Sequence, residues 1–355
     1  MAGLNRKNGV PRLSGSMYTG SPRFKAANLN GVPSATWVVV SKPFAWAYSL
    51  DDGITWSSVL TDSFTTDPKG GTWARTSAGD DEWIVGLGNT SNNTGVNVGQ
   101  VPTGSWSRFN NAGEPGRKGN FCRTSDGDYH ALMAYDDEDV CYSDSSPITY
   151  NDSSNWTKLS NLDLPTSDIE SFSLGKANDG SDLFYVAGAE KAAFVPSLGG
   201  TWDQDSGTGM SGLFLRDIHY GDGYWVFVGQ SNNIKYSNST NNWNSATMDG
   251  ETASEWNSIA YSKKQKLWVA VANGGYVGVS SGSVPSHFNV SKPIVGNLES
   301  VRCKGGTWIA GGINGKIIRS TDGKSWTEIT IAGFDPKDIQ VVLVDSLDND
   351  SLDRG

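Results

Sequence analysis

The residues best suited to metal chemistry in this sequence are one acidic run, three histidines and three cysteines. The acidic run is Asp136-Asp137-Glu138-Asp139, whereas a Ca²⁺ site needs about six to eight converging oxygen ligands. Because consecutive residues of an extended chain point to alternate faces, we expect a solvated loop here. The histidines and cysteines show neither C-x-x-C nor H-x-x-x-H spacing. The sequence therefore predicts no metal site and no cofactor.

Motifs of nucleotide binding and nucleophilic catalysis are absent from the sequence, which holds no P-loop, no G-x-S-x-G and no H-E-x-x-H. Four arginines do occupy similar places in a series of predicted strands, and these are Arg75, Arg123, Arg216 and Arg302. If those strands line a channel, some of the guanidinium groups face it. The simpler interpretation is that they pair with the many aspartates or contact channel water. We therefore predict that the chain is not an enzyme.

A turn with the pattern S-x-D-x-G-x-T-W, Ser49 to Trp56, supplies the framework that would position such residues. The short side chains of Ser49 and Asp51 can accept hydrogen bonds from backbone N–H groups one or two residues on. Gly53 can adopt a positive φ at little steric cost. Trp56 then offers a large apolar face to a neighbouring sheet. The stretch is therefore predicted to be a turn followed by an anchor between two strands.

This turn resembles the Asp-box, or BNR repeat, which joins the third and fourth strands of blades in sialidase-like β-propellers. A second copy, Ser320-Thr321-Asp322-Gly323-Lys324-Ser325-Trp326, fits with one residue deleted. Two further copies are degraded, at residues 197–202 and 237–243. The resemblance implies a fold rather than an activity, because the motif occurs in enzymes and scaffolds alike.

The copies belong to a repeat of about 40 to 50 residues that predicts an all-β propeller. Central strands are expected to begin near Trp37, Trp83, Tyr129, Phe184, Trp225, Trp268 and Trp308. Fourth-strand anchors are expected at Trp56, Trp106, Trp156, Trp202, Trp243, Phe288 and Trp326. We predict seven four-stranded blades over residues 22–330, with six or eight as alternatives.

Outside the repeats, the charge is uneven. Of the 28 Lys and Arg residues, six lie in residues 1–50, which contain none of the 38 Asp and Glu residues. We predict a basic N-terminal arm over residues 1–21 that docks through Arg6, Lys7 and Arg12. Residues 331–355 are expected to hold one more strand, Ile339 to Val344, and an acidic tail. That strand could close the ring against the N-terminal blade or reach a neighbour.

Composition also narrows the partners. The acidic body disfavours general phosphate binding, so contact with nucleic acid is expected only through the basic arm. No apolar run approaches the length of a membrane span, and residues 1–6 lack the apolar core of a signal peptide. We expect assembly in a cytoplasm.

Three functions follow from these resemblances. A sialidase would need three converging arginines, an acid/base Asp and a Tyr–Glu pair. This chain has Pro22-Arg23-Phe24 in place of the F-R-I-P sequence found at the start of that family. The family also has six blades, whereas the repeat here predicts seven. Photosystem-assembly factors also combine seven blades with degenerate Asp-boxes. They normally carry a targeting signal, and none is seen in this sequence. In its Gly-, Ser- and Asn-rich blades and basic arm, the chain resembles bacteriophage tail, nozzle or fibre proteins. We therefore predict a structural virion propeller bound to protein subunits, with a glycan-binding or glycan-hydrolysing propeller as the alternative and host-surface glycan as a further partner.

Overall fold

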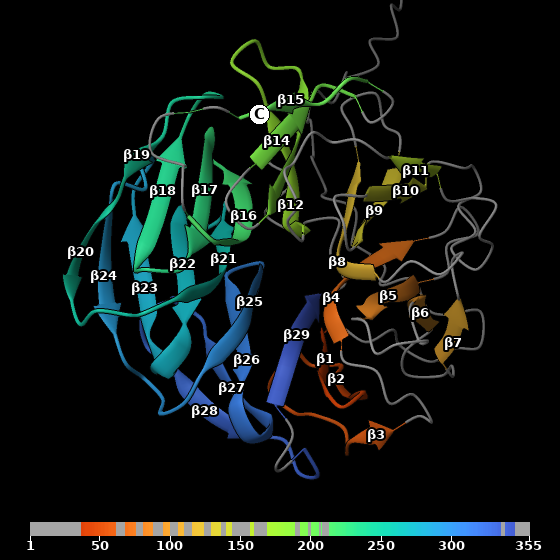
Figure 1. The fold of residues 1–355 in the computed structure, drawn as a ribbon. Coiled ribbons are helices and arrows are strands. Elements are labelled where there is room, and N and C mark those ends of the chain that lie inside the picture. The colour runs from red at the N-terminus through yellow and green to blue at the C-terminus, as the bar shows by residue number, and fades with distance from the viewer. Residues whose placement is uncertain are drawn as a thin grey trace, which may run out of the picture.

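The structure is a computed structural model. It describes residues 37–61, 68–75, 81–87, 95–99, 106–109, 116–123, 129–135, 140–143, 157–159, 169–188, 192–197, 200–205, 207, 213–334 and 338–344. These residues form seven sheets and short 3₁₀ turns (Figure 1). No helix in these ranges has the length and apolar character needed to cross a membrane.

We call the sheets blades 1 to 7 and list their strands from the inside outwards. Blade 1 contains β29 (Asp338–Val344), β1 (Trp37–Lys42), β2 (Ala45–Ser49) and β3 (Leu60–Thr61). Blade 2 contains β4 (Pro68–Arg75), β5 (Asp81–Leu87), β6 (Gly95–Gly99) and β7 (Trp106–Phe109). Blade 3 contains β8 (Gly116–Arg123), β9 (Tyr129–Tyr135), β10 (Val140–Ser143) and β11 (Thr157–Leu159). Blade 4 contains β12 (Ile169–Lys176), β13 (Asp182–Gly188), β14 (Ala192–Val195) and β15 (Asp203–Gln204).

Blade 5 contains β16 (Leu215–Gly221), β17 (Tyr224–Gly229), β18 (Asn233–Ser237) and β19 (Asn244–Ser245). Blade 6 contains β21 (Trp256–Ser262), β22 (Leu267–Ala272), β23 (Val277–Ser281), β24 (His287–Ser291) and, outermost, β20 (Thr247–Gly250). Blade 7 contains β25 (Leu298–Lys304), β26 (Thr307–Gly312), β27 (Lys316–Ser320) and β28 (Thr327–Thr330). The 3₁₀ turns η2 (Asn273–Gly275) and η3 (Ile313–Gly315) link the second and third strands of blades 6 and 7.

The inner strands form a closed cycle. β4 contacts β8, and the contacts continue through β12, β16, β21, β25 and β29 back to β4 (Figure 1). Neighbouring strands within each blade pair antiparallel, apart from β20, which joins β24 in parallel. The prediction of an all-β propeller built from four-stranded blades is confirmed, and blade 6 adds a fifth strand that the sequence pattern did not predict.

The C-terminal strand completes the first blade. β29 pairs antiparallel with β1, from Trp37 opposite Val344 to Lys42 opposite Asp338. Val342 and Leu343 are buried in the two hydrophobic clusters that flank this blade. Of the two roles expected for this strand, the structure therefore shows closure of the ring by pairing between segments about 300 residues apart.

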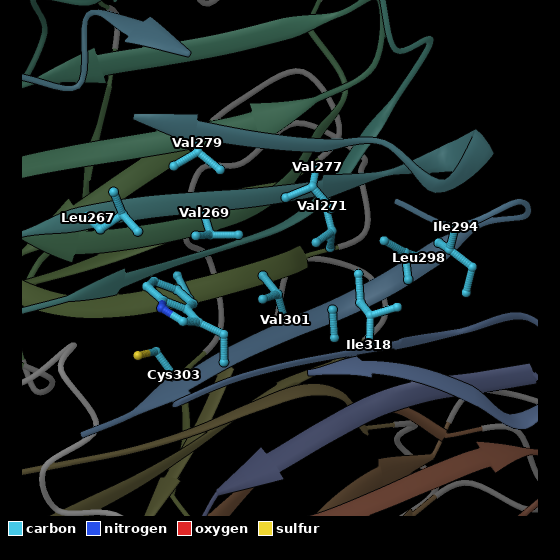
Figure 2. Packing of buried hydrophobic residues seen from close by; sticks show 13 residues of the cluster. Leu267, Val269, Val271, Val277, Val279, Ile294, Leu298, Val301, Cys303 and Ile318 are labelled. Atoms are coloured by element: carbon cyan, nitrogen blue, oxygen red, sulfur yellow. The ribbon is translucent and has the colours of Figure 1, made fainter. Parts of the chain in front are cut away.

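Each predicted central strand is the second strand of a blade, and its aromatic residue is deeply buried where the structure describes it. Trp37, Trp83, Trp268 and Trp308 have no exposed surface. Between blades 6 and 7, valine and leucine side chains of β22 and β23 pack against side chains of β25, β26 and β27 (Figure 2). These apolar interfaces hold one blade against the next.

The fourth-strand anchors are less uniform than the repeat predicts. Trp106, Trp243 and Phe288 are buried, whereas Trp56, Trp202 and Trp326 are only partly buried. The indole N–H of Trp243 donates to the Asp205 carboxylate of blade 4 at 2.8 Å, so this anchor does bind the neighbouring blade. Trp156 lies outside the described residues. The second strands therefore bury their aromatic residues more uniformly than the fourth strands do.

The Ser49–Trp56 turn is held by its own side chains. The Ser49 hydroxyl accepts a hydrogen bond from the Gly53 N–H at 2.9 Å, and Asp51 accepts one from the Thr55 N–H at 2.8 Å. Slight burial opposes the charged form of Asp51, but hydrogen bonds from Thr55 and Ser49 outweigh it and lower the pKa of that carboxyl group. The Trp56 indole N–H donates to the Gly53 carbonyl at 3.2 Å, which folds this anchor back over the turn.

The Ser320–Trp326 turn repeats this geometry. The Ser320 hydroxyl accepts from the Gly323 N–H at 2.8 Å. Backbone N–H groups of Ser325 and Lys324 donate to Asp322 and lower its pKa to about 2. Both turns therefore use the serine and aspartate side chains as acceptors for backbone donors that a tight turn would otherwise leave without partners.

Both turns also fit against the preceding blade. A Cβ atom added at Gly53 would lie 2.6 Å from Ile309 Cδ1 in blade 7, and one added at Gly323 would lie 2.3 Å from Leu267 Cδ2 in blade 6. Beside Gly53, the Asp52 carboxylate accepts from the Thr307 hydroxyl at 2.6 Å. Each turn therefore shapes an interface between blades as well as a chain reversal.

A comparison of Gly53→Ala with Gly223→Ala tests whether the turn shapes the interface with blade 7. Both glycines have φ of +79°, but nothing lies within 4 Å of the added carbon at Gly223. Both variants should lose about 1 kcal/mol to the left-handed backbone, and Gly53→Ala should lose about 1 to 3 kcal/mol more by crowding Ile309. Urea unfolding of both variants measures the difference. Equal losses of unfolding free energy would show that close packing of the turn against blade 7 does not require Gly53.

Shortening the chain tests ring closure. A chain that ends at residue 337 loses β29 and the buried side chains of Ile339, Val342 and Leu343. Burial of each contributes about 1.5 to 3 kcal/mol, so their loss approaches the whole stability of a typical domain. We expect no cooperative thermal transition by circular dichroism, whereas a control chain that ends at Val344 should melt cooperatively. Matching transitions for the two chains would contradict the closure role.

Candidate functional site

A polar cavity of about 290 Å³ lies where the N-terminal ends of several inner strands meet. Its lining consists of carboxylates, amides and one guanidinium group, from Glu170, Arg216, Glu255, Asn257, Asn273, Asn297, Glu299 and Gln340. These residues come from blades 4, 5, 6, 7 and 1 and from the loops that lead into them. The cavity is therefore a product of the ring, since no single blade supplies it.

A β-bulge in each inner strand builds this cavity. The pairing register of every inner strand with its neighbour shifts by one residue near the same end. In six blades the extra residue is Lys69, Glu170, Arg216, Asn257, Glu299 or Gln340. Five of these six line the cavity. A bulged residue is left out of the regular ladder and can be aimed differently from its neighbours, which explains how polar side chains gather here.

Arg216 organises the charges of the cavity. Its Nε donates to Glu255 Oε1 at 2.7 Å, and its Nη1 lies 3.3 Å from Glu170 Oε1. Burial works against the charged guanidinium, but the bond to Glu255 and the charges of Glu170 and Glu299 prevail and raise the pKa of Arg216. With three glutamates against one arginine, the described lining keeps a net negative charge.

The amides fix the geometry around these charges. Asn273 Nδ2 donates to Glu255 Oε2 at 2.8 Å, and Asn257 Nδ2 donates to Asn273 Oδ1 at 2.9 Å. Asn297 Oδ1 accepts from the Gly274 N–H at 3.0 Å. Both oxygens of Glu255 are thus occupied, by Arg216 and by Asn273, so the cavity is organised before any ligand arrives.

Below the cavity, side-chain oxygens connect successive inner strands. The Ile259 N–H of blade 6 donates to Asp217 Oδ2 at 3.1 Å, and the Val301 N–H of blade 7 donates to Ser258 Oγ at 3.3 Å. The Val342 N–H of blade 1 donates to Ser300 Oγ at 3.2 Å. The same bond therefore recurs at three consecutive blade interfaces, and it supplies partners for polar groups buried at the channel wall.

His219 is buried between blades 5 and 6. Its imidazole ring lies edge-on to the indole ring of Trp268, and the two ring centroids are 6.0 Å apart. Burial lowers the pKa of His219 to about 4; the nearby Arg302 adds to the effect and Asp217 opposes it. The imidazole is therefore neutral at physiological pH. His287, by contrast, lies at the surface, where its Nε2 is 3.2 Å from Asp249 Oδ2.

The four predicted channel arginines do not form one cluster. Arg216 occupies a bulge and lines the cavity. Arg302 lies further along its strand and donates to the Val301 carbonyl at 2.8 Å and the Ser258 hydroxyl at 3.3 Å. Arg75 and Arg123 end β4 and β8, at the opposite end from the bulges. One arginine therefore reaches the cavity, and no carboxylate-binding triad is evident in the described residues.

The other predicted site residues lie in the turns or outside the described ranges. Ser49, Asp51, Gly53, Ser320, Asp322 and Gly323 form the two turns rather than a binding site. The docking residues Arg6, Lys7 and Arg12 and the acidic run 136–139 lie outside the described residues. No group of three or more His, Cys, Asp and Glu side chains that could hold a metal ion occurs in the part of the chain that is described.

A short repeat in the sequence would have pointed to the cavity. Four inner strands begin with an apolar residue, a polar residue and then Ser or Asp: Ile169-Glu170-Ser171, Leu215-Arg216-Asp217, Trp256-Asn257-Ser258 and Leu298-Glu299-Ser300. The middle residue is the bulge, and the third residue accepts the bond from the next blade at Asp217, Ser258 and Ser300.

Comparison with known proteins supports the fold. No protein-family model matches the sequence, and no curated protein matches it significantly. Among solved structures, Sqt1 of Chaetomium thermophilum bound to the N-terminus of ribosomal protein L10 is 13% identical, with a TM-score of 0.57 over 84% of both chains. The WD40 repeats of RRP9 are 9% identical, with a TM-score of 0.56 over 79% of this chain and 85% of the other. The computationally designed protein Ika8 is 12% identical, with a TM-score of 0.50 over 84% of both chains. These similarities support the β-propeller fold.

The neutral state of His219 predicts a pH dependence. Between the ordinary histidine pKa near 6.5 and the folded-state pKa of about 4, the unfolded chain binds a proton that the folded chain does not. The free energy of unfolding should therefore fall as pH drops through this window, by about 1.4 kcal/mol per pH unit. Urea unfolding from pH 7 to 4 measures the slope. His219→Gln should flatten the slope and the surface control His287→Gln should keep it; an unchanged slope in His219→Gln would contradict the assignment.

Proposed function

We propose that this chain is a non-enzymatic β-propeller that binds proteins within a larger assembly. The observation that carries the proposal is the cavity at the channel mouth, which presents organised carboxylates and amides to one face of a rigid ring. Sqt1, a similar propeller, is solved with the N-terminus of a ribosomal protein bound. A comparable role in holding a peptide segment is consistent with the charge and size of this cavity.

The chemistry of the cavity argues against hydrolysis. Glycosidases need one carboxylic acid that stays protonated near neutral pH and a second, ionised carboxylate. Here the Arg216 guanidinium lies 3.3 Å from Glu170 and 2.7 Å from Glu255, so both carboxylates belong to one ion-pair network. No Ser, Cys, His or Tyr is present in the described lining to act as a nucleophile. These features fit recognition by charge rather than bond cleavage.

Glycan binding is the weaker alternative. Sugar rings stack on aromatic side chains, and the described lining contains none. Its amides could bind hydroxyl groups, but they already bind one another and Glu255.

The finer form of the proposal is a structural protein of a bacteriophage virion, assembled in the host cytoplasm and docked through the basic arm. Its support is the Gly- and Trp-rich composition, the degenerate Asp-box-like turns and the charge contrast between arm and body. A photosystem-assembly factor would also be a seven-bladed propeller, but the cavity gives no further support to that alternative.

Light scattering tests the interaction role. We expect the full chain to form species heavier than its 38.0 kDa monomer, and the variant R6Q/K7Q/R12Q to shift towards the monomer. Charge-mediated contacts should also weaken as salt increases. A wild-type monomer at every accessible concentration, combined with hydrolysis of a fluorogenic sialoside, would overturn the proposal and favour an enzyme.

A further inference from the structure

We infer that the acidic segment of residues 345–355 docks on a patch of lysines at the end of the ring opposite the cavity. The lysine patch consists of Lys264, Lys266 and Lys324. The inference goes beyond the proposed interaction role and does not depend on it. It follows from the way the patch is built, from the charge around it and from the point where β29 ends.

Gln265 builds the patch by joining three turns. Its Nε2 donates to the Gly306 carbonyl at 3.2 Å and to the Thr321 carbonyl at 2.6 Å. Its Oε1 accepts from the Trp308 indole N–H at 2.6 Å. Gln265 lies in the turn between β21 and β22, whereas Gly306 and Thr321 lie in two turns of blade 7. The fold therefore fixes the turns that carry the lysines relative to one another.

The lysines meet at the interface between blades 6 and 7, and all three are exposed. Lys264 Nζ donates at 2.8 Å to a backbone carbonyl of the β25–β26 turn in blade 7. A Cβ atom added at Gly323 would lie 2.3 Å from Leu267 Cδ2, so these two residues pack together across the interface. Their chain neighbours, Lys324 and Lys266, are therefore on adjoining turns.

Positive charge predominates around the patch. At this end of blades 5, 6 and 7, the turns that link first to second and third to fourth strands carry five lysines and two aspartates, which are Lys263, Lys264, Lys266, Lys304, Lys324, Asp222 and Asp322. Asp322 accepts from backbone N–H groups of its own turn. The local charge contrasts with the formal net charge of -10 for the whole chain.

The acidic residues of the adjoining turn in blade 1 are engaged elsewhere. Asp51 accepts hydrogen bonds from Thr55 within its own turn. Asp52 accepts from the Thr307 hydroxyl at 2.6 Å and lies 3.8 Å from Arg319. The lysine patch therefore has the charge to bind carboxylates of another segment.

Strand β29 ends beside this patch. The Val342 N–H donates to Ser300 Oγ, in the bond that recurs between successive inner strands. The recurrence matches Ser300 with Val341, and so Cys303 with Val344. Cys303 is one residue before the end of β25, where the lysine-bearing turn of blade 7 begins. The segment after Val344 therefore starts at the end of the ring that carries the patch.

This segment has the matching charge and sufficient length. Residues 345–355 contain four aspartates and one basic residue, which are Asp345, Asp348, Asp350, Asp353 and Arg354. Eleven extended residues span up to about 36 Å, and packed sheets lie about 10 Å apart, so the segment can cross from blade 1 to the patch. Docking within one chain also avoids the entropic cost of bringing two molecules together.

The basic N-terminal arm is the competing partner for this segment. Its basic residue nearest to the ring in the sequence, Lys25, precedes Trp37 by 12 residues. The patch instead offers lysines on turns that the fold fixes, and a preorganised surface binds at lower entropic cost. These considerations favour the patch.

Carbodiimide cross-linking of the full chain tests the inference. The reagent activates a carboxylate, and a lysine amine in contact with it displaces the reagent to form an amide. In the monomer, we expect mass spectrometry to find links from residues 345–355 to Lys264, Lys266 or Lys324. An unlinked segment, or links only to Lys7 or Lys25, would overturn the inference. Links between isotope-labelled and unlabelled chains in a mixture would overturn docking within one chain.

A peptide titration gives an independent measurement. In the full chain, D345N/D348N/D350N/D353N neutralises the segment and leaves the patch intact. Labelled peptide of residues 345–355 should bind this variant at least about tenfold more tightly than it binds the wild type, whose own segment occupies the patch. Equal affinity for the two proteins, or no binding to the variant, would overturn the inference.

A matched pair of lysine variants identifies the binding surface. Added to the neutralised chain, K264Q/K266Q/K324Q should weaken peptide binding at least about tenfold. The control K235Q/K292Q/K316Q removes three lysines outside the patch and should leave the affinity within about twofold. Equal affinity in both backgrounds would overturn the patch as the docking site. Melting curves confirm that the variants fold. The interaction role is tested separately through R6Q/K7Q/R12Q, so the two proposals can fail independently.

Discussion

The structure depends on one long-range pairing, that of β29 with β1. Without it, the inner strands would form an open arc, and blade 1 would expose the edge of β1 together with the apolar faces that Val342 and Leu343 cover. Closure also sets the distances across the channel, since β25 and β4 both contact β29. The cavity, which draws residues from blades 4 to 7 and 1, exists because this pairing brings the last blade to the first.

The repeated framework could be predicted from the sequence because large aromatic residues mark it. Trp37, Trp225 and Trp308 each begin or lie near the start of a second strand, and burial of such side chains leaves few alternatives for the register. The polar strand β20 escaped prediction, because Thr247-Met248-Asp249-Gly250 has no apolar alternation and pairs only through the edge of β24. The depth of the fourth-strand anchors also differed, since Trp56 folds back over its own turn.

The cavity was harder to predict, for a different physical reason. Glu170, Asn257 and Glu299 are ordinary polar residues near strand starts, and only comparison of the short repeat across several strands marks them as channel positions. Only the bulge and the closed ring determine where these side chains gather. Of the four arginines predicted to line the channel, Arg216 is the one found in the described lining of the cavity. A shift of a few residues along a strand moves a side chain to another level of the channel.

The bulges have a consequence for how such a protein can diversify. A bulged residue takes no regular place in the ladder, so its side chain can change while pairing and apolar packing stay the same. The neighbouring Asp217, Ser258 and Ser300 secure the inner strands independently of which residue occupies the bulge. The ring therefore acts as a fixed frame around a small set of exchangeable positions, and descendants of one scaffold could acquire different partners through single substitutions at the channel mouth.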